Sequence, residues 1–331
     1  MTFKLRKDLS RHTTLTYKNP PRPGNLINGL DESEWRQASH VFHNDGNSKL
    51  EWDQLDQFFA YINPWPVVLY IFKNIWNLRK ARGPAAPRTR EVTDPTAISS
   101  EIKELARSLG ADLSGITTVK PEYIYQDHDV PYRYVISIGV EMNRHRMRNV
   151  PDTESATEVM RAYERVGFVV SELSDRIRKM GWPARSYGNP NSGDLLQIPP
   201  AIDAGLGQLG KHGSLISRDH GSNFRLGCVV TDLPMSIDAP LDIGVDDLCS
   251  VCNVCVRDCP VDPIYDTRQL VRGTRKWYVD FDKCIPYFCE TYGCGICIEV
   301  CPWSEPGRGP WLSEKLLTKR AAGSTGKHVS T

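Results

Sequence analysis

The chain has 331 residues, of which 40% are hydrophobic and 24% are charged, a composition ordinary for a globular protein with a sizeable core. Its 41 basic and 40 acidic residues leave a formal net charge of +1, which gives no reason to expect a nucleic-acid partner. The length allows two or three domains.

The N-terminal part has no recognisable targeting signal. The first 24 residues lack the apolar core of a secretory signal and contain no adjacent arginine pair of the twin-arginine type. We expect residues 1–96 to form a divergent N-terminal segment. It ends in an exposed linker over 83–96, a stretch rich in proline, threonine and charge.

The most apolar run of the chain covers residues 58–78. It is interrupted by Asn63, Pro64, Pro66 and Lys73, so it offers no clean span of about 20 apolar residues, and we expect no stable membrane span. The run predicts a buried helix or a wall of a substrate pocket, and a membrane-surface segment remains an alternative. The candidates for such a pocket wall are Phe58, Phe59, Trp65 and Tyr70.

Residues 97–240 predict a mixed α/β domain. An amphipathic helix is expected around Ile102, Leu105 and Leu109, and a buried strand over 131–142. A long helix is expected over 155–180. Ser155 and Glu158 would form a capping box at its start, and Gly181 and Pro183 would end it.

Further along, residues 201–216 predict a glycine-rich turn region and 224–233 a second strand. Cys228 lies inside that strand and is expected to be a small core hydrophobe rather than a ligand. Residues 311–331 are expected to be a frayed tail.

The cysteines are concentrated in one stretch. All ten follow residue 227, and nine lie between Cys249 and Cys301. A secreted disulfide scaffold is usually short and rich in cysteine throughout. The clustering therefore predicts metal ligation in a compartment that keeps thiols reduced, and we expect a cytoplasmic protein.

Residues 241–310 contain two ferredoxin motifs. The first, CSVCNVCVRDCP, has the spacing C-x2-C-x2-C-x3-C-P that is typical of two-cluster ferredoxins, in which the fourth cysteine binds the other cluster. The second, CGICIEVCP, has Thr291 where its first cysteine is expected, so the missing ligand must be Cys284 or Cys289. The motifs predict two [4Fe–4S] clusters. Their ligands would be Cys249, Cys252, Cys255 and Cys301 for one cluster, and Cys259, Cys284 (or Cys289), Cys294 and Cys297 for the other.

Two zinc sites are the alternative use of these cysteines. The two C-P endings at ferredoxin spacing argue against zinc. Because a long N-terminal part precedes the cysteines, electrons are expected to serve a reaction there. That part shows no G-x-G-x-x-G after a strand, no P-loop and no D-x-H-x-x-G cobalamin signature.

Three stretches together resemble a known family. They are RAYERVGFVVSELSDRIRKMGWPARSYGN, IPPAIDAGLGQLGKHGSLISRDHGSNFRLGCVVTDLP, and the two cysteine motifs. Over residues 101–303, in the right order, they are similar to the cobalamin-dependent reductive dehalogenases. The epoxyqueuosine reductases are similar in the same region. The resemblance implies a nitroreductase-like α/β domain over 97–240 that holds base-off cobalamin without a histidine ligand, followed by a bacterial-ferredoxin-like domain. It also favours Cys284 over Cys289 as the remaining cluster ligand, because the segment CIPY resembles the ligand-bearing stretch of both families.

The resemblance also implies two catalytic residues. Tyr163 matches the tyrosine that reductive dehalogenases use as proton donor, and Arg225 matches the basic residue that stabilises the tyrosine anion. Taken without the family, Tyr163 would be a core aromatic residue and Arg225 a surface cation.

The glycine-rich run supplies the candidate cobalamin contacts. Glycine permits close approach of the backbone, so Gly205, Gly207 and Gly210 are expected to lie near the corrinoid, although a plain turn would use them too. Three neighbouring polar residues are candidates for binding the corrin amides or the nucleotide tail: Lys211, His212 and Ser214.

Three functions remain open at this point. The first is a reductive dehalogenase acting on a halogenated organic substrate, which we expect to be aromatic, with electrons from a separate ferredoxin or flavin reductase. The second is another cobalamin-dependent reductase, such as one for epoxyqueuosine. That family has an R-D-Y sequence with a catalytic aspartate, and this chain has Arg161, Ala162 and Tyr163, which favours the dehalogenase. The third is an electron-transfer protein without a corrinoid site.

Overall fold

The computed structural model describes residues 18–42, 50–61, 63–188 and 193–325. At its centre is a four-stranded antiparallel sheet in the order β1–β2–β6–β3. The four strands are β1 (Leu113–Thr118), β2 (Tyr134–Glu141), β6 (Phe224–Thr231) and β3 (Ala184–Tyr187).

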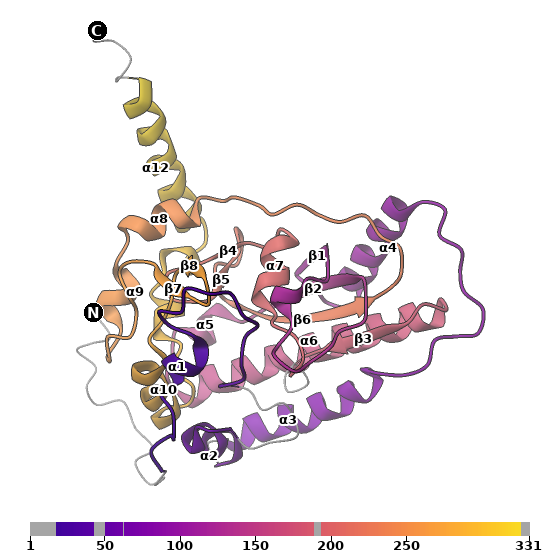
Figure 1. Ribbon diagram of the computed structural model, residues 1–331, viewed down its shortest axis with the longest axis horizontal. Coiled ribbons are helices and arrows are strands. Elements are labelled where there is room, and N and C mark those ends of the chain that lie inside the picture. The colour runs from indigo at the N-terminus through magenta and orange to yellow at the C-terminus, as the bar shows by residue number, and fades with distance from the viewer. Residues whose placement is uncertain (1–17, 43–49, 62, 189–192, 326–331) are drawn as a thin grey trace.

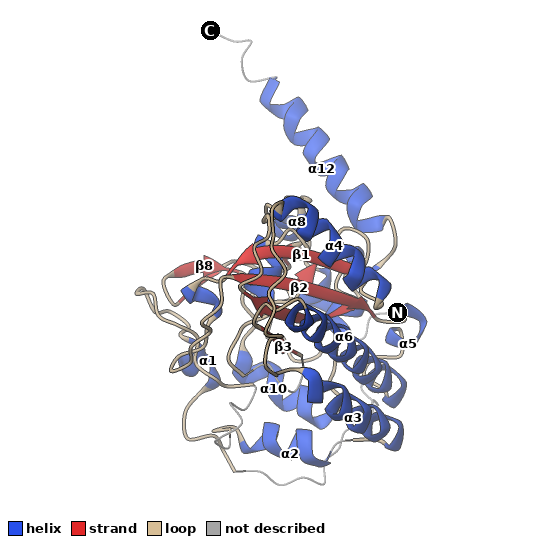
Figure 2. Ribbon diagram, turned by 90° about the vertical axis from the view of Figure 1, so that its right-hand side faces the viewer, coloured by secondary structure: helices blue, strands red, loops and turns tan. Residues whose placement is uncertain are grey.

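Helices lie on both faces of this sheet (Figure 1). The long helix α6 (Thr153–Lys179) crosses β2, β6 and β3, and α4 (Pro95–Ser108) packs beside it on β1. On the opposite face, α7 (Ile198–Asp203) packs against β1 and β2. Helix α3 (Trp65–Asn77) lies on the outer side of α6, so it forms a further layer away from the sheet (Figure 2).

The side chains of β6 alternate between two cores, as the period of a strand requires. Val229 lies in the core beneath α6, whereas Cys228 and Val230 lie in the core on the opposite face. The predicted strands over 131–142 and 224–233 are therefore confirmed as β2 and β6, and the core role of Cys228 is confirmed as well.

The cysteine-rich part consists of short helices and one hairpin. These elements are α8 (Val245–Val251), α9 (Val254–Asp258), β7 (Gln269–Val271), β8 (Thr274–Lys276), α10 (Phe281–Glu290), α11 (Ile296–Glu299) and the 3-10 turn η4 (Pro302–Ser304). The N-terminal helices α1 (Gly24–Asn28) and α2 (Asp53–Tyr61) pack against α10. The remaining short elements are η2 (Leu78–Lys80), η3 (Pro121–Tyr123) and α5 (Arg144–Met147).

The predicted long helix exists, but its predicted start is wrong. Helix α6 begins at Thr153, and the carboxylate of Asp152 caps it by accepting a hydrogen bond from the Thr153 amide. Ser155 lies inside the first turn, and Glu158 is fully buried and forms an ion pair with Arg161, so these two make no capping box. The helix ends at Lys179, next to Gly181 with φ of 84°, as the glycine predicted.

The apolar run over 58–78 is not a buried helix. It forms the end of α2 and the whole of α3, separated near Pro64. Trp65, Phe72 and Trp76 are 72%, 68% and 65% exposed, whereas the face of α3 that meets α6 contains Asn74. The prediction placed the apolar side of this helix against the core. Instead, its large aromatic side chains face the surface, and Asn74 packs closely against Gly167 of α6.

Two smaller expectations also need correction. The region 201–216 is not a simple turn, because α7 includes its first residues and a hairpin of β4 (Gln208–Leu209) and β5 (Leu215–Ile216) follows. The tail expected from residue 311 is helical as far as Thr325, in α12 (Arg308–Thr325), which extends away from the rest of the molecule (Figure 1). Ser313 is buried there and donates to the Ile243 carbonyl at 3.1 Å. Residues 326–331 lie outside the described residues.

The close contact of α3 with α6 gives a test of this packing. A Cβ added at Gly167 would lie 2.2 Å from Asn74 Oδ1. Gly167→Ala should therefore destabilise the protein by about 1–3 kcal/mol, the usual cost of overpacking, although alanine is the better helix former. Ser171→Ala, one turn later and equally buried, is the control and should change the unfolding midpoint little. A Gly167→Ala protein as stable as the parent in denaturant unfolding would contradict this packing.

Candidate functional site

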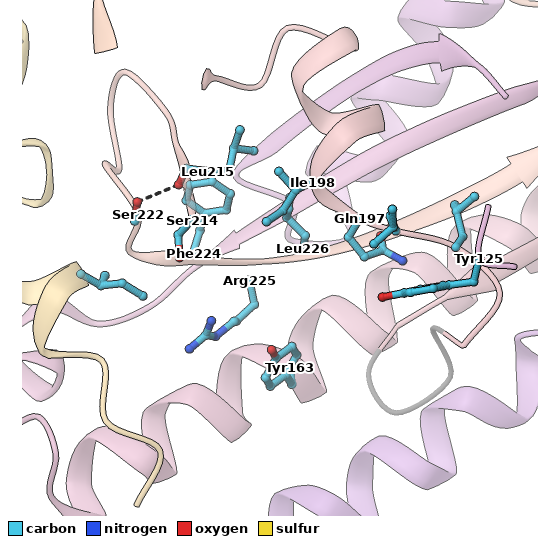
Figure 3. Close-up of a pocket in the computed structure, with 13 residues that line it drawn as sticks. Tyr125, Tyr163, Gln197, Ile198, Ser214, Leu215, Ser222, Phe224, Arg225 and Leu226 are labelled. Atoms are coloured by element: carbon cyan, nitrogen blue, oxygen red, sulfur yellow. Dashed lines mark hydrogen bonds between the residues drawn. The ribbon is translucent and has the colours of Figure 1, made fainter. Parts of the chain in front are cut away.

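A pocket of about 270 Å³ lies where α6, β6 and the β4–β5 hairpin meet. Its lining is mostly apolar, with a few polar side chains, an arrangement typical of small-molecule sites. The described lining residues are Tyr125, Tyr163, Leu195, Leu196, Gln197, Ile198, Ser214, Leu215, Ser222, Phe224, Arg225, Leu226 and Ile298 (Figure 3).

The pocket brings Tyr163 and Arg225 together, although 62 residues separate them in sequence. The guanidinium carbon of Arg225 lies 5.1 Å from the centre of the Tyr163 ring. Arg225 Nε is buried, and among the described residues it has no hydrogen-bond partner. At this distance a guanidinium over an aromatic ring is held by a cation–π interaction, and its charge favours any negative charge that develops on the tyrosine oxygen.

The packing of α6 on β6 explains why these two side chains meet. A Cβ on Gly227 would lie 3.0 Å from Val166, so the strand and the helix approach closely at this point. Tyr163 lies one turn before Val166 on the same helix face. Arg225 precedes Gly227 by two residues and therefore lies on the same face of the strand.

The opposite wall comes from the segment before α7 and from the β4–β5 hairpin. Ser222 Oγ donates to the Leu215 carbonyl at 2.7 Å and holds the end of the hairpin (Figure 3). Gln197 Oε1 is buried without a partner among the described residues, so it is an acceptor that a ligand can satisfy. Burial raises the pKa of Tyr125 to about 12, so its hydroxyl stays protonated at neutral pH and can donate a hydrogen bond.

Beside this pocket, four cysteines line a second, much smaller cavity. They are the cysteines assigned to one cluster: Cys249, Cys252, Cys255 and Cys301. The cavity is completed by Lys211, His212, Leu248, Pro302 and Trp303. Burial raises the pKa of Cys249 to about 11 and of Cys255 to about 12, so these thiols keep their protons unless a metal ion replaces them.

A second group of cysteines gathers next to the first. Burial is the main cause that raises the pKa of Cys284 and Cys294 to about 12, and the electrostatic influence of Cys259 adds to it at both thiols. Burial is also the main cause that raises the pKa of Cys297, and the electrostatic influence of Cys294, Cys284 and Cys259, and of Cys255 from the first group, adds to it. Among the described residues, no three His, Cys, Asp or Glu side chains are arranged to hold a single metal ion.

Cys284 and Cys289 differ in their surroundings. Both lie on α10, five residues apart, so their side chains point about 140° apart around the helix. Cys289 is buried in an apolar cluster with Trp52 and Leu55, whereas Cys284 lies toward Cys259. The structure thus supports Cys284 as the member of the second group.

Two of the residues predicted as cobalamin contacts lie elsewhere. Lys211 and His212 line the small cysteine cavity, and the Lys211 amide donates to Cys249 Sγ at 3.4 Å. Lys211 Nζ donates to Asn253 at 2.6 Å. Burial lowers the pKa of His212 to about 4, so its ring is neutral at ordinary pH. Ser214, the third polar candidate, does line the larger pocket.

The three candidate glycines face the protein's own backbone or side chains. Added Cβ atoms would lie 2.6 Å from the Ala239 carbonyl at Gly205 and 2.0 Å from the Ile216 carbonyl at Gly207. At Gly210 the neighbours are the side chains of Ile216 and His212. Tight packing around the β4–β5 hairpin thus accounts for these glycines, and their contact with a corrinoid stays a prediction.

The prediction of which N-terminal residues form the pocket wall is wrong. Phe58, Phe59, Trp65 and Tyr70 do not line the pocket. Phe58 instead packs on Phe288 with ring centres 5.0 Å apart, in the cluster around Cys289. Apart from Tyr163, Arg225 and Ser214, the residues that line the pocket were not predicted from the sequence. Phe224 and Leu226 flank Arg225 in a predicted strand, which was a usable signal, but no sequence pattern singled out Gln197 or Ile298.

No helix in the described part of the chain is long and apolar enough to cross a bilayer. No protein-family model matches the sequence.

Known relatives were found by sequence. Tetrachloroethene reductive dehalogenase of Sulfurospirillum multivorans is 29% identical over 266 residues, 66% of this chain and 52% of that enzyme. The enzyme of the same name from Desulfitobacterium hafniense is 29% identical over 184 residues, 52% of this chain and 33% of that enzyme. Epoxyqueuosine reductase of Salmonella typhimurium is 31% identical over 156 residues, 40% of this chain and 37% of that enzyme. The chain thus spans about half the length of these relatives or less.

Solved structures agree with the sequence matches. A reductive dehalogenase described with a mechanism for B12-dependent dehalogenation superposes with a TM-score of 0.71 at 26% identity, over 80% of this chain and 41% of that one. A catabolic reductive dehalogenase in complex with 3-bromo-4-hydroxybenzoic acid gives a TM-score of 0.75 at 24% identity, over 94% of this chain and 46% of that one, and so supports the fold. In sequence and in fold, this chain is therefore a relative of the B12-dependent reductive dehalogenases, and in sequence it is also related, over a shorter stretch, to the epoxyqueuosine reductases.

Proposed function

We propose that this chain carries the catalytic centre of a reductive dehalogenase that replaces a carbon–halogen bond by a carbon–hydrogen bond. The observation that carries the proposal is the Tyr163–Arg225 pair inside a pocket that lies beside a cavity lined by four cysteines. The reaction consumes two electrons and one proton and releases halide, so it needs an electron supply and a proton donor at one place. Relatives that carry out B12-dependent dehalogenation support this assignment.

The chemical character of the side chains that line the pocket matches that of a corrinoid ring. Such a ring has broad apolar faces and an edge of amide groups. The lining offers apolar side chains such as Ile198 and Leu226, and the unpartnered Gln197 Oε1 for an amide. A corrinoid is larger than the 270 Å³ cavity, so it would extend past the rim. When bound, cobalamin supplies the reducing cobalt centre, and we propose that it binds base-off.

The cysteines fit two [4Fe–4S] clusters. We assign Cys249, Cys252, Cys255 and Cys301 to the first cluster, and Cys259, Cys284, Cys294 and Cys297 to the second. Support comes from the cavity shared by the first four and from the mutual electrostatic influence of the others. Clusters of this kind transfer single electrons, and two of them suit a two-electron reduction.

Tyr163 is the proposed proton donor. Its hydroxyl gives its proton to the carbon that loses the halide, and the phenolate that remains is stabilised by the guanidinium of Arg225, 5.1 Å from the ring centre. The apolar lining around the pair excludes water and strengthens this electrostatic effect.

The finer parts of the proposal concern substrate, donor and location. A halogenated aromatic would occupy only the part of the pocket next to Tyr163 and Arg225, with the corrinoid filling the rest and extending past the rim. One structural relative was solved with 3-bromo-4-hydroxybenzoic acid, which supports a substrate of this class. We propose a separate ferredoxin or flavin reductase as electron donor and a cytoplasmic location, where thiols stay reduced. The nitroreductase-like part over 97–240 and the ferredoxin-like part over 241–310 belong to the same proposal.

Activity on epoxyqueuosine is the less favoured alternative. The position of that family's catalytic aspartate is Ala162 here, which is fully buried against Tyr287 and Ile296 and does not line the pocket. An acid at this place is absent, and the pocket contains no carboxylate among its described lining residues.

The first prediction concerns cofactors and activity. Protein matured anaerobically with iron, sulfide and cobalamin should contain about eight irons, show corrinoid absorption bands, and release halide from halophenols with a chemical reductant. Base-off binding should give a Co(II) electron paramagnetic resonance spectrum without nitrogen splitting from an axial ligand. Iron–sulfur absorption alone, with no corrinoid bound and no halide released, would support an electron-transfer protein instead.

The second prediction tests the proton donor. Tyr163→Phe keeps the ring and removes the hydroxyl, so turnover should fall by roughly 10²-fold or more with iron and cobalamin content unchanged. The control is Tyr134→Phe. Tyr134 is also buried next to an arginine, with Arg133 5.3 Å from its ring centre, but it does not line the pocket. Near-parental turnover of a fully loaded Tyr163→Phe protein would exclude Tyr163 as the acid.

The third prediction distinguishes the two cysteines of α10. Cys284→Ser should lower the iron content because it removes a proposed ligand. Cys289→Ser should leave the iron content unchanged, because Cys289 lies in an apolar cluster. Iron and acid-labile sulfide analysis of both variants measures this, and the reverse result would transfer the ligand assignment to Cys289.

A further inference from the structure

We propose that the side-chain N–H groups of His212 and Trp303 donate hydrogen bonds to sulfur atoms of the first cluster and raise its reduction potential. The inference rests on the proposed function in one respect, the presence of the cluster held by Cys249, Cys252, Cys255 and Cys301.

The hydrogen bonding of His212 fixes which ring nitrogen carries the proton. The Ser214 amide donates to His212 Nδ1 at 3.2 Å, so Nδ1 is an acceptor and the ring proton of the neutral imidazole is on Nε2. Nε2 is buried and has no hydrogen-bond partner among the described residues. The side chain is 5% exposed and lines the cavity of the four cysteines.

Trp303 presents a second donor to the same cavity. It follows Cys301 by two residues, in the 3-10 turn η4, and is 3% exposed. Its indole Nε1 is buried, and it too has no partner within the described part of the chain. A buried N–H without a partner is destabilising, so two of them in a single small cavity indicate that a group bound there supplies the acceptors.

The acceptors available at this place are sulfur atoms. The cavity is lined by cysteines and by no carboxylate, and the Lys211 amide already donates to Cys249 Sγ at 3.4 Å. Hydrogen bonds to cluster sulfurs stabilise the reduced, more negative state of the cluster, and they are one of the determinants of its potential. The N–H groups of His212 and Trp303 therefore stabilise the reduced state of the first cluster.

A buried cation also lies at the first cluster's site. The Lys211 side chain is 1% exposed, and its ammonium lies 5.0 Å from the ring centre of Trp277. Each group has a carboxylate nearby, Asp246 at Cys249 and Asp280 at Cys284. A cation stabilises added negative charge, so the effect of Lys211 on the first cluster has the same sign as that of the hydrogen bonds.

Two substitutions remove the donors with little other change. Trp303→Phe deletes the indole N–H and keeps an aromatic ring. His212→Asn keeps an acceptor for the Ser214 amide and loses the donor at Nε2. The matched control is Trp277→Phe, because Trp277 belongs to the same apolar cluster but donates its N–H to Asp246 at 3.0 Å.

The potentials of both clusters are measured by redox titration followed by electron paramagnetic resonance, on the full chain with its clusters. Cys284→Ser identifies the signal of the first cluster, because that substitution alters only the second. We expect Trp303→Phe and His212→Asn each to shift the first cluster to lower potential. The second cluster and the Trp277→Phe protein should stay at their parental potentials.

A second experiment uses the unsubstituted protein, so it remains informative even if a variant fails to fold. Exchange into D2O should shift the iron–sulfur stretching bands in resonance Raman spectra, and the shift should shrink in Trp303→Phe. Unchanged potentials in both variants with full iron content, or no effect of D2O, would overturn the inference and leave the proposed function intact. Equal shifts in Trp277→Phe and Trp303→Phe would also overturn it, since packing would then be the cause. A protein that binds no cluster at all would refute both.

Discussion

The close packing of α6 on β6 is the contact on which the candidate site depends. Gly227 allows the strand to approach Val166, and a Cβ there would lie 3.0 Å from that side chain. One helical turn before Val166 covers about 5 Å, and two strand residues before Gly227 cover about 7 Å. The residues at these two positions therefore stay close to the contact and to each other. Tyr163 and Arg225 occupy those two positions, and their 5.1 Å approach is a consequence of the core.

The β4–β5 hairpin connects this pocket with the cysteines. Its connection carries Lys211 and His212 to the first group of thiols, while Ser214 and Leu215 reach the larger pocket. One short element thus borders both sites, and its glycines allow it to pack tightly against neighbouring carbonyls.

Burial of so many thiols has an energetic consequence. Desolvation raises the pKa of Cys249 and Cys255 in the first group and of Cys284 and Cys294 in the second, so these thiols are neutral and poorly solvated when no metal is bound. If the clusters bind as we propose, iron replaces the thiol protons, and the free energy of binding contributes directly to the stability of this part of the fold. The N-terminal helices α1 and α2 pack on α10 next to the second group, and the cysteine-rich part is therefore not a detached module.

The sequence by itself determined what depends on local spacing. Cysteine intervals predicted the two ligand groups, short apolar runs predicted β2 and β6, and Gly181 predicted the end of α6, because each pattern reflects the geometry of a single segment. The resemblance to a family supplied Tyr163 and Arg225 and the preference for Cys284 over Cys289. Only the tertiary structure decided which side of an element faces what: Lys211 and His212 toward the first group of cysteines, and the aromatic face of α3 toward the surface. The physical reason is that a sequence pattern can predict a helix without fixing which of its faces is buried. The buried face depends on contacts with segments far away in the chain, such as that of Asn74 with Gly167.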